Sequence, residues 1–122
     1  KYSQAELDKM YPQVLNEKVP TRVTPEQTYA KLLAALKVGD LAEASRQFVA
    51  EDQAKWLESL QKIKEKGMME KMVGDLDKEL TKGLTGDAMA SYSISILKDG
   101  IEWGNQIDFI KDSNGDWKIK SL

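Results

Sequence analysis

The sequence contains no cysteine and no histidine. Without histidine, the chain lacks the most common general base and the most common metal ligand of proteins. Without cysteine, it lacks thiolate nucleophiles, disulfides, iron–sulfur sites and thiolate zinc sites. A site built from carboxylates alone would suit Ca²⁺ or Mg²⁺, but no stretch has EF-hand spacing and the glycines stand singly rather than in a phosphate-binding loop. We therefore predict no catalytic residue, no metal site and no cofactor.

Long hydrophobic runs and an excess of one charge are also missing. No run reaches the roughly 18–20 apolar residues that a membrane-spanning helix needs. The formal net charge is −2, and residues of both signs are spread along the chain, whereas a nucleic-acid-binding protein normally presents a basic face. We therefore predict neither a transmembrane segment in this chain nor a nucleic-acid partner.

The 122 residues, 41% hydrophobic and 31% charged, have the composition of one globular domain. We expect an N-terminal arm over residues 1–23 and a single domain over residues 24–122. In the arm, Ser3 and Glu6 form a capping box, Pro12 disturbs the helix that follows, and residues 16–23 are interpreted as a linker. Because the chain begins at Lys1 rather than Met, we interpret it as either a processed product or a trimmed chain, from which any targeting segment has been removed.

Helix signals dominate the first half of the domain. Thr24 and Gln27 form a capping box around Pro25, which favours a helix start, and Gly39 is placed to end that helix in the left-handed conformation. Asp40 then caps a second helix whose buried side includes Phe48. Two more helices are predicted over residues 51–66 and 68–76, separated by Gly67. Met68 and Met69 are adjacent, so one of the two is expected to be exposed.

After about residue 78 the hydrophobic period changes from 3.6 to 2, which predicts strands. Asp99-Gly100 is typical of a two-residue type I′ hairpin turn. This turn and the alternation of apolar and polar residues predict the same register independently. On the apolar face this register pairs Ala90 with Phe109, Tyr92 with Ile107, Ile94 with Asn105 and Ile96 with Trp103. On the polar face it pairs Ser91 with Asp108, Ser93 with Gln106 and Ser95 with Gly104.

A second hairpin contains Gly115. A three-residue loop with a left-handed Gly115 pairs Phe109 with Ile119 and Ile107 with Ser121, and we prefer it to a two-residue loop, which mixes the faces. Residues 79–84 carry both helical and strand signals, and we favour a short first strand there.

These elements predict an α+β fold in which N-terminal helices pack on one face of a three- or four-stranded antiparallel meander. The chain resembles the nuclear transport factor 2-like, or cystatin-like, superfamily over about residues 24–122. The likeness is carried by three segments of the sequence: the helix from Pro25 to Gly39 with the following Asp40-Leu41 and Phe48, the strand from Gly86-Asp87-Ala88 to Asp99-Gly100, and the closing Phe109-Ile110-Lys111-Asp112, Gly115 and Trp117-Lys118-Ile119.

The resemblance is closest to small bacterial domains of unknown function that are associated with envelope lipoproteins. It implies an extracytoplasmic location, with lipid anchoring through a segment absent from this chain. Enzymes of the superfamily carry Asp, His or Tyr in a conical pocket between sheet and helices. This chain has no histidine, and Asp108 falls on the polar sheet face, which argues against enzyme activity. An enzyme would need a carboxylate in the cleft from Glu70 or Asp75.

We hypothesise a non-catalytic binding domain of the bacterial cell envelope that holds a small apolar ligand or a protein partner between helices and sheet. Polar groups that project into an apolar pocket would orient a ligand, although each of these side chains also suits a plain core position. The candidate cleft residues are Tyr29, Trp56, Met72, Tyr92, Trp103 and Asn105.

The alternative hypothesis is a structural or protein-interaction module with a filled core, acting through the outer sheet face or the arm. Short polar side chains on that face would allow a second sheet to approach closely and form a homodimer. The candidate interface residues are Ser91, Ser93, Ser95 and Gln106. The acidic side chains of Asp75, Asp77 and Glu79 are interpreted as a solvated surface rather than a cation site.

Overall fold

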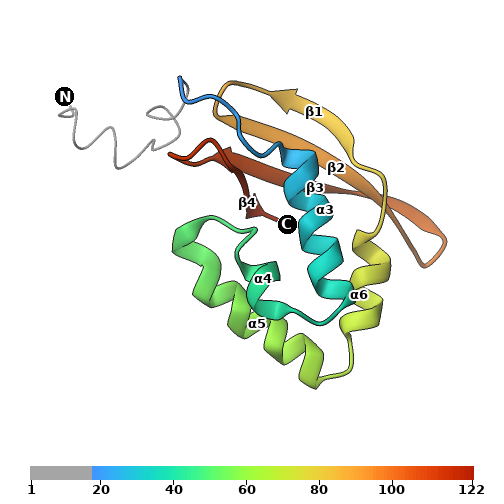
Figure 1. The fold of residues 1–122 in the computed structure, drawn as a ribbon. Coiled ribbons are helices and arrows are strands. Elements are labelled where there is room, and N and C mark those ends of the chain that lie inside the picture. The colour runs from blue at the N-terminus through green and yellow to red at the C-terminus, as the bar shows by residue number, and fades with distance from the viewer. Residues whose placement is uncertain (1–17) are drawn as a thin grey trace, which may run out of the picture.

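The protein folds as a four-stranded antiparallel sheet with its helices gathered on one face (Figure 1), as the α+β prediction requires. The structure is a computed structural model that describes residues 18–122. The capping box and helix predicted within residues 1–17 lie outside this range. The elements are α3 (Pro25–Lys37), α4 (Leu41–Ser45), a 3₁₀ turn (Ala50–Asp52), α5 (Gln53–Glu65), α6 (Met69–Leu76), β1 (Thr81–Thr85), β2 (Met89–Lys98), β3 (Ile101–Lys111) and β4 (Trp117–Ser121).

Local signals set the ends of the helices. The Thr24 side chain accepts a hydrogen bond from the Gln27 amide, and the Gln27 side chain accepts one from the Thr24 amide, so the predicted capping box of α3 is confirmed. Gly39 follows α3 with a φ of +75°, and Asp40 caps α4 through the Glu43 amide. Each cap satisfies a backbone amide that the helix itself leaves unpaired.

The remaining helices follow the predicted boundaries closely. The helix expected over residues 51–66 opens with the 3₁₀ turn and continues as α5, and Gly67 separates it from α6 with a φ of +71°. Of the adjacent methionines, Met68 is 46% exposed, whereas Met69 packs against the core. The expectation that one of the two is exposed is confirmed.

The β2–β3 hairpin has the predicted register throughout. Tyr92 pairs with Ile107, Ser93 with Gln106, and Ile96 with Trp103. The φ angles of Asp99 and Gly100 are +54° and +77°, as a type I′ turn requires at both central positions. Turn chemistry and binary pattern therefore specify this hairpin together.

The register of β3 with β4 was predicted in part. Phe109 pairs with Ile119 as expected, and Gly115 has a φ of +86°. The pairing of Ile107 with Ser121 was wrong, because a register shift between Asp108 and Phe109 places Ser121 opposite Asp108. The shift brings the Ser121 hydroxyl 2.9 Å from Asp108 Oδ2, to which it donates a hydrogen bond.

The two edges of the sheet differ in what covers them. β1 is the short first strand that was favoured for residues 79–84, and its five residues are all exposed. The edge of β4 is covered by residues 47–49 and by Val23, which lie parallel to it in isolated bridges. Residues 16–23 were predicted to be a linker, but within their described part Val23 bridges to Asp116 and Arg22 donates to the Gly115 carbonyl oxygen.

The hydrophobic core lies between the helices and the inner face of β2, β3 and β4. Its largest side chains are fully buried and come from α3, α5, the sheet and the segment after α4. They are Leu32, Leu36, Phe48, Leu60, Ile94, Ile107, Phe109 and Ile119.

Candidate functional site

Both tyrosines predicted for the cleft are buried, and Tyr29 is hydrogen-bonded within the protein. Tyr29 on α3 donates its hydroxyl hydrogen to the Leu76 carbonyl oxygen at the end of α6. Burial, with the nearby Asp77 carboxylate, raises the pKa of Tyr29 to about 12, so the hydroxyl remains a donor. This side chain ties α3 to α6 rather than facing an open cavity.

Trp56 and Met72 also belong to the packed interior. The indole of Trp56 stacks on the ring of Phe48 with centroids 4.2 Å apart, and Met72 is half-buried on α6 against the core. The fully buried Phe48 lies beside β4 through its bridge to Ile119. Trp56 therefore faces the β4 side of the core.

Trp103 lies outside the core, so its expected role as a core anchor is wrong. Its side chain is 56% exposed, because it sits near the turn of the β2–β3 hairpin, which extends beyond α6 (Figure 1). Asn105, one pair further along the strand, is half-buried opposite Ile94. The predicted set of six residues is thus divided between the core and the end of a hairpin, and does not form one cleft.

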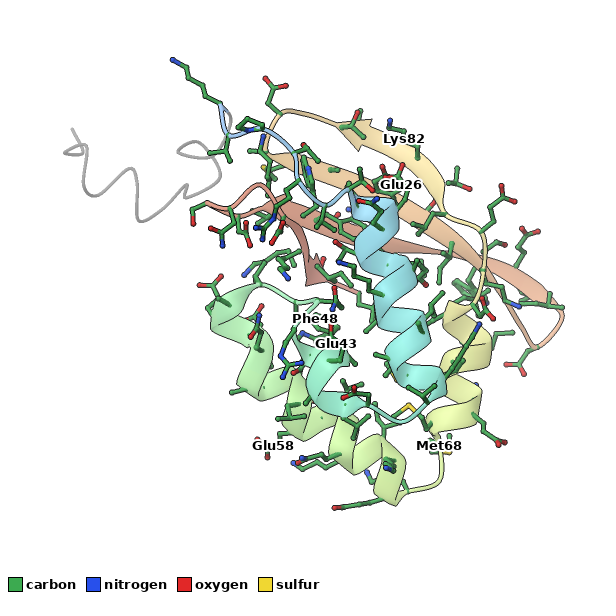
Figure 2. All side chains as sticks on the ribbon, viewed as in Figure 1. Glu26, Glu43, Phe48, Glu58, Met68 and Lys82 are labelled. Atoms are coloured by element: carbon green, nitrogen blue, oxygen red, sulfur yellow. The ribbon has the colours of Figure 1, made fainter. Side chains whose placement is uncertain are left out.

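A groove lies instead where α3 begins, against the inner face of β1 and β2. We call it the α3 groove; its volume is about 330 Å³. Figure 2 labels its two charged residues, Glu26 at the start of α3 and Lys82 on β1. Tyr92 is the one predicted cleft residue that lines it. The lining residues are Thr21, Thr24, Pro25, Glu26, Lys82, Thr85, Gly86, Ala90, Tyr92 and Trp117.

A tyrosine and a carboxylate lie near each other in the α3 groove. Burial is the main cause that raises the pKa of Tyr92 to about 12, and the nearby Glu26 carboxylate adds to the effect. The Tyr92 hydroxyl therefore stays protonated beside Glu26. Lys82 pairs with Tyr92 in the sheet register and so lies on the same face.

The remaining wall of the groove comes from a segment before α3. Residues 19–23, which we call the strap, cross the β3–β4 turn. Trp117 Nε1 donates to Thr21 Oγ1 at 3.1 Å, and Lys111 Nζ donates to the Val19 carbonyl oxygen at 2.6 Å. Trp117 is 5% exposed and belongs to the hydrophobic core.

An ion pair and a close backbone contact hold the strap in place. The Arg22 guanidinium binds Asp116 through two contacts, of which Nε to Oδ1 is 2.7 Å. These hydrogen bonds are the main cause that lowers the pKa of Asp116, with burial opposing them. A Cβ on Gly115 would lie 2.0 Å from the Pro20 carbonyl oxygen, so only glycine fits beneath the strap.

The outer sheet face carries the polar residues predicted for it. The Asp108 carboxylate accepts hydrogen bonds from Ser91, Gln106 and Ser121 at 2.8–2.9 Å. Burial opposes ionisation of Asp108, but these bonds together lower its pKa. A hollow of about 390 Å³ lies on this face and is lined by Gly83, Leu84, Ser91, Tyr92, Ser93, Gly104 and Gln106. Ser95, the remaining predicted interface residue, is exposed and bonds to Glu102.

The end of the β2–β3 hairpin is apolar on both faces. Ile101 and Trp103 are each 56% exposed on the inner face, and Leu97 is 71% exposed on the outer face. We call these three residues the hairpin end. Exposed apolar residues that cluster mark surfaces for interaction, whereas single ones are ordinary.

The acidic residues of the α6 region behave as a solvated surface. Asp75 pairs with Lys71 at 3.2 Å and Asp77 with Lys37 at 2.9 Å, and Glu70 is exposed. Within residues 18–122, no three acidic side chains gather as metal ligands. No helix in this part of the chain is both long and apolar enough to cross a bilayer.

Glu26, Lys82 and Thr21 were missed as candidate site residues. Lys82 could have been found by extending the register of β2 to β1, because that register places it on the face of Tyr92. Glu26 lies in the first turn of α3, but the helix-start signal does not show which part of the sheet that turn faces. Thr21 gave no signal, since its position depends on the strap crossing a distant turn.

Comparison of the chain with protein-family models, curated proteins and solved structures found no match.

Proposed function

We propose that this protein is a non-catalytic binding domain of the bacterial cell envelope and that its binding site is the α3 groove. The envelope location follows from the resemblance of the sequence alone. One observation carries the binding proposal: a hollow of about 330 Å³ brings Glu26, Lys82 and Tyr92 together with threonine hydroxyls. Small-molecule sites are typically hollows of at least about 300 Å³ with a few convergent polar groups.

The lining of the groove changes the expected class of ligand. An apolar ligand was expected for a cleft between the tyrosines and tryptophans, but Tyr29 and Trp56 pack within the protein and Trp103 lies outside the core. The groove instead presents charged and hydroxyl groups, and an apolar ligand would leave them unpaired at a cost in affinity. A small polar ligand suits this lining better.

The test is a thermal-shift screen of a polar metabolite library, followed by ¹H–¹⁵N correlation spectra of the full chain with each hit. A ligand of the folded state raises the melting temperature as its concentration rises. We expect hits to shift the amide signals of Lys82, Gly86, Ala90 and Tyr92.

A matched pair of variants on β1 locates the site. Thr85 lines the groove, whereas Thr81 pairs with Ser93 on the outer face, and both are exposed. Thr85→Trp should fill the groove and abolish the shifts, and Thr81→Trp should leave them unchanged. The absence of hits, or hits unaffected by Thr85→Trp, would contradict the proposal.

The hairpin end favours a second candidate, a protein-interaction module. Ile101 and Trp103 expose apolar side chains on the inner face at the end of this strand pair, which extends beyond α6, and Leu97 is exposed on the opposite face. If this surface binds a partner or a second copy, Trp103→Ala should reduce the association measured by analytical ultracentrifugation, whereas Ser93→Arg on the outer face should not. An effect of Ser93→Arg alone would favour the outer sheet face.

A further inference from the structure

The geometry points to a zwitterion the size of an amino acid or a dipeptide as the ligand of the α3 groove, with its ammonium on Glu26 and its carboxylate on Lys82. This inference rests on the proposed binding function of the groove. It follows from two opposite charges that line one small hollow, on different elements, without pairing with each other.

Glu26 has room to accept hydrogen bonds from a ligand. Its carboxylate lies in the groove lining with Tyr92, and an ionised carboxylate offers about four acceptor positions. The residue lies in the first turn of α3 and is exposed. A ligand ammonium that reaches it would form charge-assisted hydrogen bonds, which are stronger than neutral ones.

Lys82 provides the opposite charge from the other side of the groove. Its side chain forms no ion pair or hydrogen bond with any residue in the 18–122 range. Its ammonium has three donors on a flexible stem, so it can follow a carboxylate within the hollow. The β1–β2 register fixes its strand position beside Tyr92.

A ligand of a single charge would satisfy only half of this arrangement. An anion would meet Lys82 but also approach the Glu26 carboxylate, and a cation would meet Glu26 but also approach Lys82. A zwitterion offers an opposite charge to each of the two side chains at the same time. The hollow of about 330 Å³ limits the ligand to a small molecule, and Thr21 and Thr85 add hydroxyl groups at its wall.

The test removes the charges of ligand and protein one at a time. The probes are the twenty free amino acids and dialanine at millimolar concentration, followed by N-acetyl-dialanine, which lacks the ammonium, and dialanine amide, which lacks the carboxylate. Binding is read from the amide shifts of Lys82, Gly86, Ala90 and Tyr92. We expect each cap to weaken binding by about tenfold, the effect of one charge-assisted contact.

Variants then assign each ligand charge to its partner. Glu26→Gln should remove the preference for dialanine over N-acetyl-dialanine and keep the preference over the amide. Lys82→Gln should do the reverse. Glu70→Gln and Lys98→Gln, which remove exposed charges elsewhere, should change neither preference. This crossed pattern would not arise from a general loss of folding.

The outcomes separate this inference from the proposed function. If library ligands shift the groove amides but free zwitterions bind no better than their capped forms, the zwitterion inference is wrong and the binding function stands. If Glu26→Gln and Lys82→Gln leave both preferences unchanged, the assignment of charges is likewise wrong. If no compound shifts the groove amides, both proposals fail.

Discussion

The two hairpins of the sheet share a strand, yet their turns lie in opposite surroundings. The β2–β3 turn at Asp99-Gly100 is exposed, and Trp103 beside it is 56% exposed. The β3–β4 turn contains the buried Gly115, and Trp117 beside it is 5% exposed. Both turns have glycine at positive φ. A tryptophan follows three residues after Gly100 and two residues after Gly115. Local sequence alone does not distinguish them.

The strap makes the difference between the two hairpins. It adds backbone hydrogen bonds from Arg22 to the Gly115 carbonyl oxygen and from Trp117 to the Val23 carbonyl oxygen, and it forms a wall of the α3 groove through Thr21. No described segment covers the β2–β3 turn in this way. A hairpin of this sheet becomes core or surface according to which distant segment crosses it.

Replacing each tryptophan by alanine gives the largest contrast. Trp117→Ala removes a buried side chain and should lower the free energy of unfolding by about 3–5 kcal/mol. Trp103→Ala removes a largely exposed side chain and should cost less than about 1 kcal/mol. Urea unfolding followed by far-ultraviolet circular dichroism measures both. Equal losses for the two variants would show that Trp103 is buried in solution.

A glycine pair tests the strap contact itself. Gly115→Ala and Gly100→Ala both place a side chain at positive φ, which costs about 1–2 kcal/mol. At Gly115 the new Cβ also meets the Pro20 carbonyl oxygen at 2.0 Å, whereas at Gly100 it meets nothing within 4 Å. We expect a total loss of about 3 kcal/mol for Gly115→Ala, since displaced packing adds about 1–3 kcal/mol. Similar losses in urea unfolding would mean that the strap does not lie over the turn.

The ion pair of the strap should appear in the dependence of stability on pH. Arg22 lowers the pKa of Asp116, so the unfolded chain binds this proton more tightly than the folded chain. The stabilisation is therefore complete above the ordinary pKa near 3.8 and is lost as pH falls through the lowered value. Asp116→Asn should reduce the melting temperature at pH 7 and flatten its decline below about pH 4.

Asp99→Asn provides the control for Asp116→Asn. It removes a carboxylate from the exposed turn, and asparagine tolerates the positive φ of Asp99. The control should keep the acid decline of the unaltered protein. Because Arg22 is largely exposed, added salt should weaken the contribution of Asp116. Identical acid declines for the two variants would contradict the role assigned to the ion pair.

The same comparison shows what the sequence could predict. The capping residues Thr24 and Asp40, the register around Asp99-Gly100 and the left-handed Gly115 depend on neighbours within a few residues, and each was predicted correctly. The Ile107–Ser121 pairing failed because Ser121 shifts to meet Asp108. That shift depends on contacts between side chains, not on the turn.

The site was less predictable because it depends on where the helical layer ends. Alternation placed Tyr92 and Trp103 on one sheet face, and both are there. Only Tyr92 lies beneath the helices, and alternation does not show how far along a strand they reach. The groove brings Thr21, Glu26 and Lys82 together from three separate segments. These residues meet only because the strap crosses the β3–β4 turn, and local sequence patterns do not encode that position.

The smallest contrast concerns one hydrogen bond in each hairpin. Thr21→Val removes the acceptor of Trp117 Nε1 and should cost about 1 kcal/mol, because the indole N–H lies in a partly buried site. Ser95→Ala removes the bond from Ser95 to Glu102 on the exposed hairpin, where water replaces it, and should cost less than about 0.5 kcal/mol. Urea unfolding resolves this difference if the two variants are measured side by side.

Thr21 also lines the groove, so Thr21→Val should weaken dialanine binding as well, whereas Ser95→Ala should not. A loss of stability without any loss of binding would limit the strap to a structural role, and would separate the wall of the groove from its charged residues.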